Sequence, residues 1–559
     1  MPGHPVGLRA PGQPGNGEVL VDQDRRSRPR TRWGSVVAVV TLLATAFVSA
    51  GVVAAPAGAA TAGPKPGGEV RFGLEGETTG GYCLWSSQLA ISGIQVVSAV
   101  YDTLTSPNTK GKYVPNLAES VTPNADSTEW TIKVRPNIKF QNGEPLNADA
   151  VKLNIDQWLK GTLFAFVFNN IDHTDKVDDL TVKVTTKTPW PAFPAYLFLV
   201  GRAGIMAPAQ INDTTNCTSN LIGTGPFKLD SWKVNESLTV SKNPNYWKKD
   251  AKGNQLPYLD KITFVPVVDA PTRDNQLIGG QLDMLHTSSA QSIDKFRKTS
   301  GYDTVTEPPG NRDVHYYMLN TAQAPFNNAD ARRAIAEALN IKQINQIRNK
   351  GLFQVTNSVI DSKAQGYVKN NGLPKYNPTD AKALVEKVKA ANGGKFDVTF
   401  LTTDDTESLA EVQLLAEQVQ KVGMSPNLSQ VNQAQLINTA LAGKFSVMVW
   451  RNFHSDPEFG DAANYVWWSK TSPINFPRID DPAMQTALVD GRSAADADAD
   501  YVTMNKEMGA GQYIIPGWFV DWTIVSKGVK GILGAPLPDG SQPRFMYGRI
   551  PVDALYKTK

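Results

Sequence analysis

The sequence predicts a mixed α/β protein, and three observations support this. Hydrophobic residues make up 41% and charged residues 19% of the 559 positions, which excludes a disordered or fibrous chain and suffices for several domains or one large bilobed body. In the first half, several short segments alternate apolar and polar residues, as half-buried strands do. Between residues 327 and 450, helical and strand patterns follow one another one for one.

The first half contains strand patterns separated by turn and helix signals. The strand patterns cover residues 69–73, 128–134 and 179–186. Between the second and the third, Asn142-Gly143 predicts a turn, and Asn147 can cap a helix that runs through Leu159. We therefore expect an α+β region whose sheet is partly antiparallel.

The second half is predicted from helix caps and apolar spacing. Asn328 can cap a helix whose buried side carries Ile335, Leu339 and Ile347. The elements predicted after it are a helix that opens at Asn377-Pro378, a strand over 396–401, a helix over 406–423, a helix over 432–442 and a strand over 445–450. Short connections between such units favour a largely parallel sheet covered on both faces.

The start of the chain has the layout of a secretory signal. Residues 1–33 hold six Arg and three acids, which accounts for the whole net charge of +3, and we expect them to be a disordered basic N-region. Residues 34–60 are expected to be the apolar part of a signal peptide, cleaved near Ala59 or Ala60, with no Cys nearby to carry a lipid anchor. The uncharged run is also long enough to span a bilayer, so a retained anchor is the alternative. Both interpretations export the rest of the chain to the periplasm or the extracellular face of the cytoplasmic membrane, and the neutral charge of that exported part excludes a basic patch for nucleic acid.

Few residues suggest covalent or metal chemistry. Cys83 and Cys217 are the only cysteines, and in an exported chain such a pair forms a disulfide more often than it stays as two free thiols. The five histidines have no metal-ligand spacing, so we expect no metal and no cofactor. The usual local catalytic motifs are missing. His454 beside residues 455–458 could supply a base, a nucleophile and an acid, but a capped turn after a buried strand is the favoured interpretation.

Tryptophans are the more informative signal, because eleven of the twelve lie in the exported part. A tryptophan offers a flat apolar face and one N–H donor, which suits a peptide side chain or a sugar ring, although plain core packing is an equal alternative for each. Those expected near a cleft are Trp85, Trp450, Trp467, Trp468, Trp518 and Trp522. If adjacent Trp467 and Trp468 are in a strand, they point to opposite faces.

Two neighbouring motifs carry a resemblance to a known family. Residues 223–232 read Gly-Thr-Gly-Pro-Phe-Lys-Leu-Asp-Ser-Trp, and residues 242–247 read Lys-Asn-Pro-Asn-Tyr-Trp. Together they resemble solute-binding family 5, the extracytoplasmic oligopeptide-, dipeptide- and nickel-binding proteins of ABC importers. Further matches, in family order from about residue 67 to the end of the chain, lie at 140–146, 279–283, 319–321, 325–326, 332–335 and 376–378.

The resemblance implies a two-lobed fold like that of periplasmic binding proteins, with an inserted subdomain in the first lobe and two interlobe crossovers. The expected parts are lobe I over 61–305 with the inserted subdomain at about 106–222, lobe II over 306–522, and a return to lobe I over 523–559. It also implies the function. The protein would capture a peptide or peptide-like solute between its lobes by hinge closure and deliver it to a membrane permease, as a monomer and without acting as an enzyme.

The segment 449–457 resembles the family's "W-x-x-D-x-x-D-P" stretch at the lobe interface. In peptide binders of the family, the first Asp of that stretch holds the α-ammonium of the ligand. Here that position is Phe453, and a neutral ring cannot form the charge-assisted bond that an ammonium needs. Asp456 matches the second acid, in a position typical of a turn residue. Arg451 could meet a carboxylate of the solute, or it could lie at the surface beside the buried strand.

The site residues that the resemblance implies come from three segments. They are Glu75, Tyr82 and Trp85 after the first strand; Trp450, Arg451, Asn452, Phe453, His454 and Asp456 in the interface segment; and Trp518 and Trp522 near the return crossover. A disulfide between Cys83 and Cys217 would hold one wall of the cleft.

Two further function hypotheses remain at this point. An oligosaccharide or other non-peptide solute is suggested by Phe453 and by the many tryptophans, since sugars stack on aromatic rings. A secreted hydrolase is suggested only by export and by His454.

Overall fold

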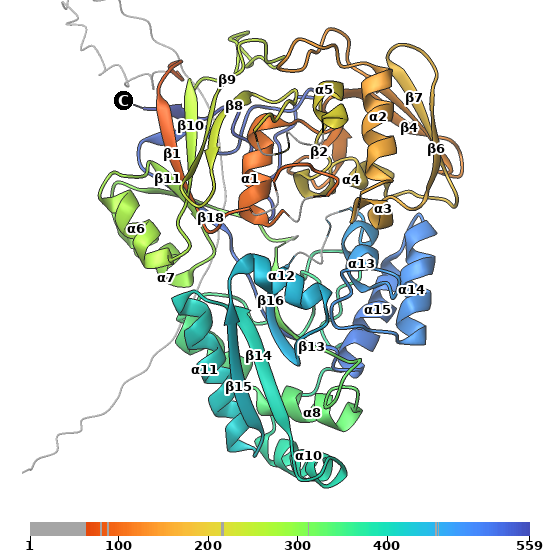
Figure 1. Ribbon diagram of the computed structural model, residues 1–559, viewed down its shortest axis with the longest axis vertical. Helices are drawn as coiled ribbons and strands as arrows, with labels where there is room; N and C mark the ends of the chain where they lie inside the picture. The colour runs from red at the N-terminus through yellow and green to blue at the C-terminus, as the bar shows by residue number, and fades with distance from the viewer. Residues whose placement is uncertain are drawn as a thin grey trace, which may run out of the picture. The chain divides into compact units, whose positions relative to one another are not determined.

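The computed structural model describes residues 63–558, apart from 79–80, 87–88, 162, 214–216, 218, 311, 453–455 and 457 (Figure 1). The basic N-region over 1–33, the signal segment over 34–60, Phe453 and His454 therefore lie outside the described residues. Among the described residues, no helix combines the length and the apolar character that crossing a bilayer needs.

A seven-stranded sheet forms the centre of the first lobe. Its spatial order is β12 (Asp303–Thr306), β18 (Thr523–Ser526), β11 (Met284–Thr287), β1 (Glu69–Leu74), β10 (Lys261–Pro266), β9 (Ser237–Lys242) and β8 (Phe227–Lys233). β1 is parallel to both of its neighbours, and the other pairs are antiparallel. The helices that follow these strands are α1 (Ile91–Val100), α6 (Ala270–Ile278) and α7 (Ala290–Lys298). Val70 and Phe72 alternate into the core as their spacing predicts.

A four-stranded antiparallel sheet interrupts the first lobe. Its order is β4 (Ala118–Pro123), β5 (Glu129–Val134), β7 (Thr181–Thr186) and β6 (Ile171–Lys176). Helix α2 (Ala148–Trp158) packs against it, and the Asn147 side chain accepts from the Ala150 amide as the predicted cap. The remaining short elements of this lobe are β2 (Thr105–Pro107), β3 (Tyr113–Pro115), α3 (Phe164–Val167), α4 (Phe193–Tyr196), the 3₁₀ turn η1 (Leu199–Gly201), α5 (Pro208–Asn212), β19 (Val529–Lys530) and β20 (Tyr556–Lys557).

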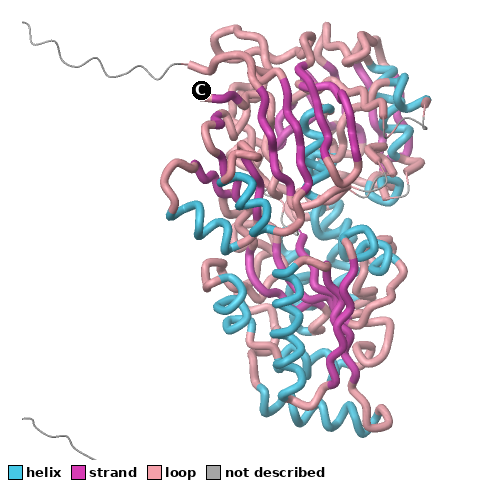
Figure 2. The backbone as a smooth tube through the Cα atoms, turned by 60° about the vertical axis from the view of Figure 1, so that its left-hand side comes forward, coloured by secondary structure: helices cyan, strands magenta, loops and turns pink. Residues whose placement is uncertain are grey.

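A five-stranded sheet forms the second lobe. Its order is β15 (Ser425–Val431), β14 (Asp397–Thr403), β16 (Val447–Asn452), β13 (Val314–Leu319) and β17 (Ile514–Phe519). The helices of this lobe are α8 (Ala329–Ala338), α9 (Ile341–Asn349), α10 (Pro378–Ala391), α11 (Thr406–Lys421), α12 (Gln433–Leu441), α13 (Asp461–Trp468), α14 (Pro482–Ser493) and α15 (Asp498–Ala510). Figure 2 shows the strands of this lobe running side by side between their helices.

The second sheet is mixed, so the expectation of a largely parallel sheet is wrong for half of its pairings. β14 is parallel to β15 and to β16, whereas β13 is antiparallel to both β16 and β17. The chain passes between the two large sheets at 307–313, before β13, and at 520–522, after β17. The chain therefore enters the second lobe through β13 and leaves it through β17, so these two strands run in opposite directions. The same geometry turns the carboxyl ends of β14, β15 and β16 toward the first lobe.

One local prediction is wrong, one conditional expectation does not apply, and one strand is missed. The helix predicted from Asn328 is two helices, because Leu339 has an extended backbone and Asn340 caps a new helix; Ile347, in the second, is 54% exposed. Trp467 and Trp468 lie in helix α13, not in a strand. Strand β15 has no counterpart in the prediction, since it is an edge strand without a buried apolar alternation.

Candidate functional site

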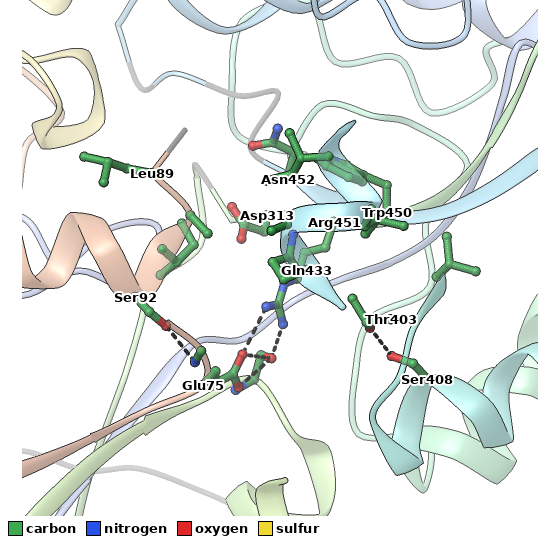
Figure 3. Close-up of a pocket in the computed structure, with 18 of the residues that line it drawn as sticks. Glu75, Leu89, Ser92, Asp313, Thr403, Ser408, Gln433, Trp450, Arg451 and Asn452 are labelled. Atoms are coloured by element: carbon green, nitrogen blue, oxygen red, sulfur yellow. Dashed lines mark hydrogen bonds and ion pairs between the residues drawn. The ribbon is translucent and has the colours of Figure 1, made fainter. Parts of the chain in front are cut away.

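A cavity of about 650 Å³ lies between the two large sheets. Residues that follow β1 and β11 line it from the first lobe. From the second lobe, the carboxyl ends of β14 and β16 and the first turns of α11 and α12 line it (Figure 3). Cavities of this size enclose small-molecule solutes, and the carboxyl ends of strands are where open α/β sheets place their ligands.

An ion pair joins the two lobes at this cavity. Arg451, in β16, approaches Glu75, which follows β1, with its Nη2 3.0 Å from the carboxylate Oε2 (Figure 3). The same guanidinium donates to Ser288 Oγ and lies over the Trp522 ring, 4.5 Å from its centroid. Arg451 therefore meets a carboxylate, as the sequence suggests, but this carboxylate belongs to the protein.

The Glu75 carboxylate is fully engaged. The Ser288 amide donates to its Oε1 at 2.7 Å, the Ser288 hydroxyl contacts both oxygens, and Arg273 Nη2 lies 3.4 Å from Oε1. Burial alone raises the pKa of Glu75, but the charges of Arg451 and Arg273 and the Ser288 amide outweigh it and lower the pKa to about 2. Glu75 is thus an anion that positions Arg451 and Ser288.

His286 is hydrogen-bonded to the backbone of the same loop. Its Nε2 accepts a hydrogen bond from the Glu75 amide at 2.8 Å, which requires that nitrogen to be unprotonated. The imidazole is completely buried, and burial lowers its pKa to about 4. The neutral ring is therefore part of the folded structure at neutral pH.

Replacing His286 by glutamine is expected to reduce the loss of stability at mildly acidic pH. The imidazole of the unfolded chain binds a proton as the pH falls through 6.5, whereas that of the folded protein does so near 4. Between these pH values, protonation therefore stabilises the unfolded state relative to the folded one. This group should lower the free energy of unfolding by about 2 kcal/mol between pH 7.5 and pH 5. Urea denaturation of the wild type and of His286→Gln at both pH values measures the difference. His173→Gln, at the exposed surface, should keep the wild-type difference, and an unchanged difference in His286→Gln would contradict the assignment.

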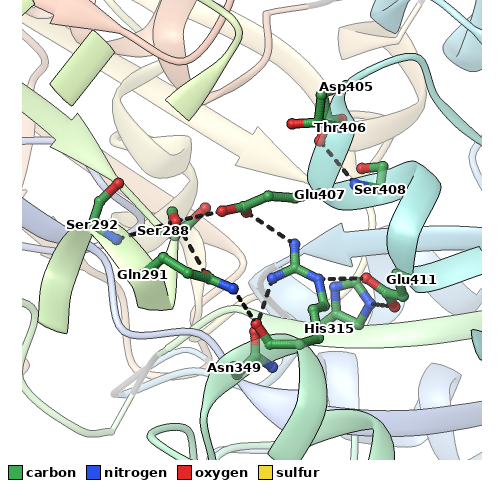
Figure 4. A network of polar contacts seen from close by, with 12 residues as sticks. Ser288, Gln291, Ser292, His315, Asn349, Asp405, Thr406, Glu407, Ser408 and Glu411 are labelled. Atoms are coloured by element: carbon green, nitrogen blue, oxygen red, sulfur yellow. Dashed lines mark hydrogen bonds and ion pairs between the residues drawn. The ribbon is translucent and has the colours of Figure 1, made fainter. Parts of the chain in front are cut away.

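A second polar network borders the cavity at the start of α11 (Figure 4). Glu411 accepts from Tyr317 at 2.9 Å and from Arg348 Nε at 2.8 Å, and its Oε1 lies 2.6 Å from His315 Nε2. Burial raises the pKa of Glu411, but His315 and Arg348 outweigh it and lower the pKa to about 2. The network therefore keeps Arg348 in place at the cavity wall.

Glu407, one turn before Glu411, connects this network to the first lobe. It accepts from Arg348 Nη2 at 3.3 Å and from the hydroxyl of Ser289, the residue that caps α7. Nearby, the Thr406 hydroxyl donates to Asp269 at 3.2 Å. The two lobes are thus hydrogen-bonded on this side of the cavity as well.

The structure brings together five of the described site residues that the sequence predicts. Those that line the cavity are Glu75, Trp450, Arg451, Asn452 and Trp522. Those that do not line it are Tyr82, Trp85, Trp518 and Asp456.

The four remaining side chains are occupied elsewhere. Tyr82 packs edge-on against Trp232, and Trp85 is buried in the same core. Trp518 stacks on the His315 ring, with 4.2 Å between the centroids. Asp456 is a turn residue, which accepts from the Phe459 amide at 2.7 Å and from the Tyr113 hydroxyl. Trp467, expected near a cleft, also lines the cavity.

The two cysteines are paired. Cys83 and Cys217 form a disulfide with their Cα atoms 5.1 Å apart. Next to it, the Tyr82 amide donates to the Cys217 carbonyl at 2.8 Å. The loop after β1 is thereby attached to the loop after α5, as hypothesised.

Several cavity residues escape the sequence analysis. The charged ones that it misses are Glu77, Arg202, Arg273, Asp313, Arg348, Asp404, Asp405 and Glu407. Asp313 has a recognisable signal, since it directly precedes β13, whose six residues are all buried. An acid placed at the entry to such a strand is an unusual buried charge and a candidate for function.

Two lobes joined by two crossovers, with a cavity between them that residues of both lobes line, define a solute-binding protein of the two-lobed type. The model of the bacterial extracellular solute-binding proteins, family 5 middle part, matches residues 112–475. The chain belongs to this family, which confirms the resemblance in the sequence.

Curated relatives match part of this chain. The chain is 29% identical over 329 residues to the glutathione-binding protein GsiB of Pectobacterium atrosepticum, and 29% identical over 324 residues to GsiB of Shigella flexneri serotype 5b. The matches cover 58% and 57% of this chain and 62% and 61% of those relatives, so the chain aligns with about three fifths of their length.

The solved structures share the fold. AgaA of A. tumefaciens R10, in complex with agropinic acid, has a TM-score of 0.77 at 24% identity, covering 88% of this chain and 99% of that one. The oligopeptide-binding protein AppA of Bacillus subtilis, in complex with a nonapeptide, has a TM-score of 0.77 at 20% identity, covering 89% of this chain and all of that one. The predicted mixed α/β, two-lobed fold is confirmed.

Proposed function

We propose that this protein is the substrate-binding component of an ABC importer and that it captures a short peptide or peptide-like solute. The observation that carries this is the cavity between the lobes, lined from both sides, with the Glu75 and Arg451 ion pair across it. Membership of solute-binding family 5 supports the transport role, and the relatives named as glutathione-binding proteins support a peptide-like solute.

Closure would couple capture to delivery. The strands β13 and β17 adjoin the two crossovers, so a change of backbone angles there can rotate one sheet against the other. Contacts such as Arg451 with Glu75 form only when the lobes meet, and solute would favour that state by contacting both walls. The closed form would then be recognised by the permease. In this role the protein binds its solute, acts as a monomer and performs no chemistry on it.

Export follows from the same role. The proposed signal segment would direct the chain to the outer face of the cytoplasmic membrane and would be cleaved near Ala60. N-terminal sequencing of the exported protein tests this, because a mature chain that starts at or near Thr61 excludes a retained anchor.

Isothermal titration calorimetry with glutathione, tri-alanine and maltotriose tests the class of solute. We expect micromolar or tighter binding of at least one of the two peptides and none of maltotriose. Quenching or enhancement of tryptophan fluorescence should accompany binding, because Trp450 and Trp522 line the cavity. Binding of maltotriose without either peptide would replace the proposal by the oligosaccharide alternative.

A further inference from the structure

Asp313 occupies a special place in the cavity. It ends the first crossover, directly before β13, and its side chain faces the cavity between the lobes (Figure 3). The residue is only 1% exposed. A carboxylate buried to this degree needs a cation or several hydrogen bonds to offset the loss of water.

The hydrogen bonds of Asp313 are incomplete. Its Oδ2 accepts from the Trp522 indole N–H at 2.8 Å. Across the part of the chain that the structure describes, no donor reaches its Oδ1, although that atom is buried. Trp522 itself packs against the Arg451 guanidinium and the His286 ring, which hold the indole beside the carboxylate.

Apart from Asp404, which is exposed, the other described carboxylates at the cavity already have partners. Glu75 accepts from Ser288 and pairs with two arginines. Asp405 caps α11 by accepting from the Ser408 amide at 2.9 Å, and Glu407 accepts from Arg348 and Ser289. Asp313 is therefore the buried acid that retains an acceptor atom for a ligand.

The nearby cations do not satisfy Asp313. Arg451 donates to Ser288 and Glu75, and Arg202 Nη2 donates to the Leu89 carbonyl at 2.9 Å. Burial raises the pKa of Asp313, and the Trp522 hydrogen bond and the charges of Arg451 and Arg202 only partly oppose this. A bound ammonium group would supply the missing charge-assisted hydrogen bond.

We propose that Asp313 receives the positively charged amino group of the bound solute, and that the solute is accordingly a primary amine such as a peptide with a free amino end. This inference rests on the proposed function. It assigns the recognition of the amine to the crossover before β13, whereas position 453 carries a phenylalanine. The specificity for a cationic end would thus come from the crossover region, where the acid is buried.

The test compares two probes that differ in the amino group alone. Tri-alanine has a free amino end, and propionyl-Ala-Ala has hydrogen in its place and is no bulkier. By calorimetry at neutral pH, the wild type should bind tri-alanine about 30-fold more tightly than propionyl-Ala-Ala, as is typical of a hydrogen bond to a buried charge. Asp313→Asn, which keeps an acceptor for Trp522, should lose this preference by weakening tri-alanine alone.

Asp461→Asn is the matched control. Asp461 is a buried acid that also accepts from an indole N–H, that of Trp190 at 3.1 Å, and its Oδ1 has no partner among the described residues, but it does not line the cavity. This variant should keep the 30-fold preference. Circular dichroism checks each fold, and Asp313→Ser, which is smaller than the native residue, serves if Asp313→Asn does not fold.

Two results would overturn the inference in different ways. Equal binding of the two probes by the wild type, or equal weakening of both in Asp313→Asn, would refute the role of Asp313 and leave peptide binding intact. No binding of tri-alanine, glutathione or propionyl-Ala-Ala by the folded wild type would refute the proposed function and this inference together.

Discussion

Replacing Arg451 by methionine is expected to weaken peptide binding by about 30- to 150-fold, because breaking a hydrogen-bonded charge pair between the two lobes costs roughly 2 to 3 kcal/mol. Methionine keeps much of the stem length that packs on Trp522 but removes the guanidinium. Glu75 would then keep Arg273 and Ser288 as partners but lose the bond that joins it to the second lobe. The population of the open form should therefore rise relative to that of the closed form.

A double-mutant cycle with Glu75→Gln tests whether the effect passes through this ion pair. If Arg451 acts by joining the lobes, the double variant should bind tri-alanine little worse than either single variant. Additive losses would instead indicate that Arg451 contacts the solute directly. Arg333→Met removes an exposed arginine from an ion pair with the buried Glu337, and it should leave affinity unchanged because neither residue lines the cavity. Wild-type affinity in Arg451→Met would contradict both roles.

The elements that sequence reasoning predicts well are those that local chemistry decides. Asn147, Asn328 and Asn377 each cap a helix where expected, because a side-chain oxygen satisfies amides only a few residues away. The helix break after Ala338 escapes prediction because the apolar spacing continues through Leu339, which is extended in the structure and precedes the new cap at Asn340.

The site is harder to predict because distant segments build it. Glu75 and Arg451 are 376 positions apart, and family resemblance suggests each as a ligand contact without indicating that they bind each other. Trp518 and Trp522 are four residues apart, yet only the second lines the cavity. Trp518 lies in β17 of the second lobe, next to a register shift in the pairing of β13 with β17. Trp522 lies in the crossover after that strand. Such differences follow from the meeting of two sheets, which no local pattern encodes.

Replacing both cysteines by alanine is expected to lower the free energy of unfolding by about 3 kcal/mol, the typical value for a disulfide that closes a long loop. The bond links positions 134 residues apart, so it restricts the unfolded chain over the whole inserted sheet. Alanine suits both positions, because each cysteine is nearly buried and a polar replacement would add a second penalty. Urea denaturation of Cys83→Ala/Cys217→Ala under oxidising conditions measures the loss.

Reduction of the wild type supplies the control for this prediction, since it breaks the same bond without changing the sequence. The reduced wild type and the double variant should have urea midpoints close to each other and below that of the oxidised wild type. Affinity should fall much less than stability, because the disulfide attaches the loop after β1 at Cys83, several residues beyond Glu75, while Ser288 and Arg273 still hold Glu75 itself. Thiol titration that finds two free thiols in the native exported protein would refute the bond, and a loss of binding as large as that of Arg451→Met would show that the disulfide positions the cavity wall directly.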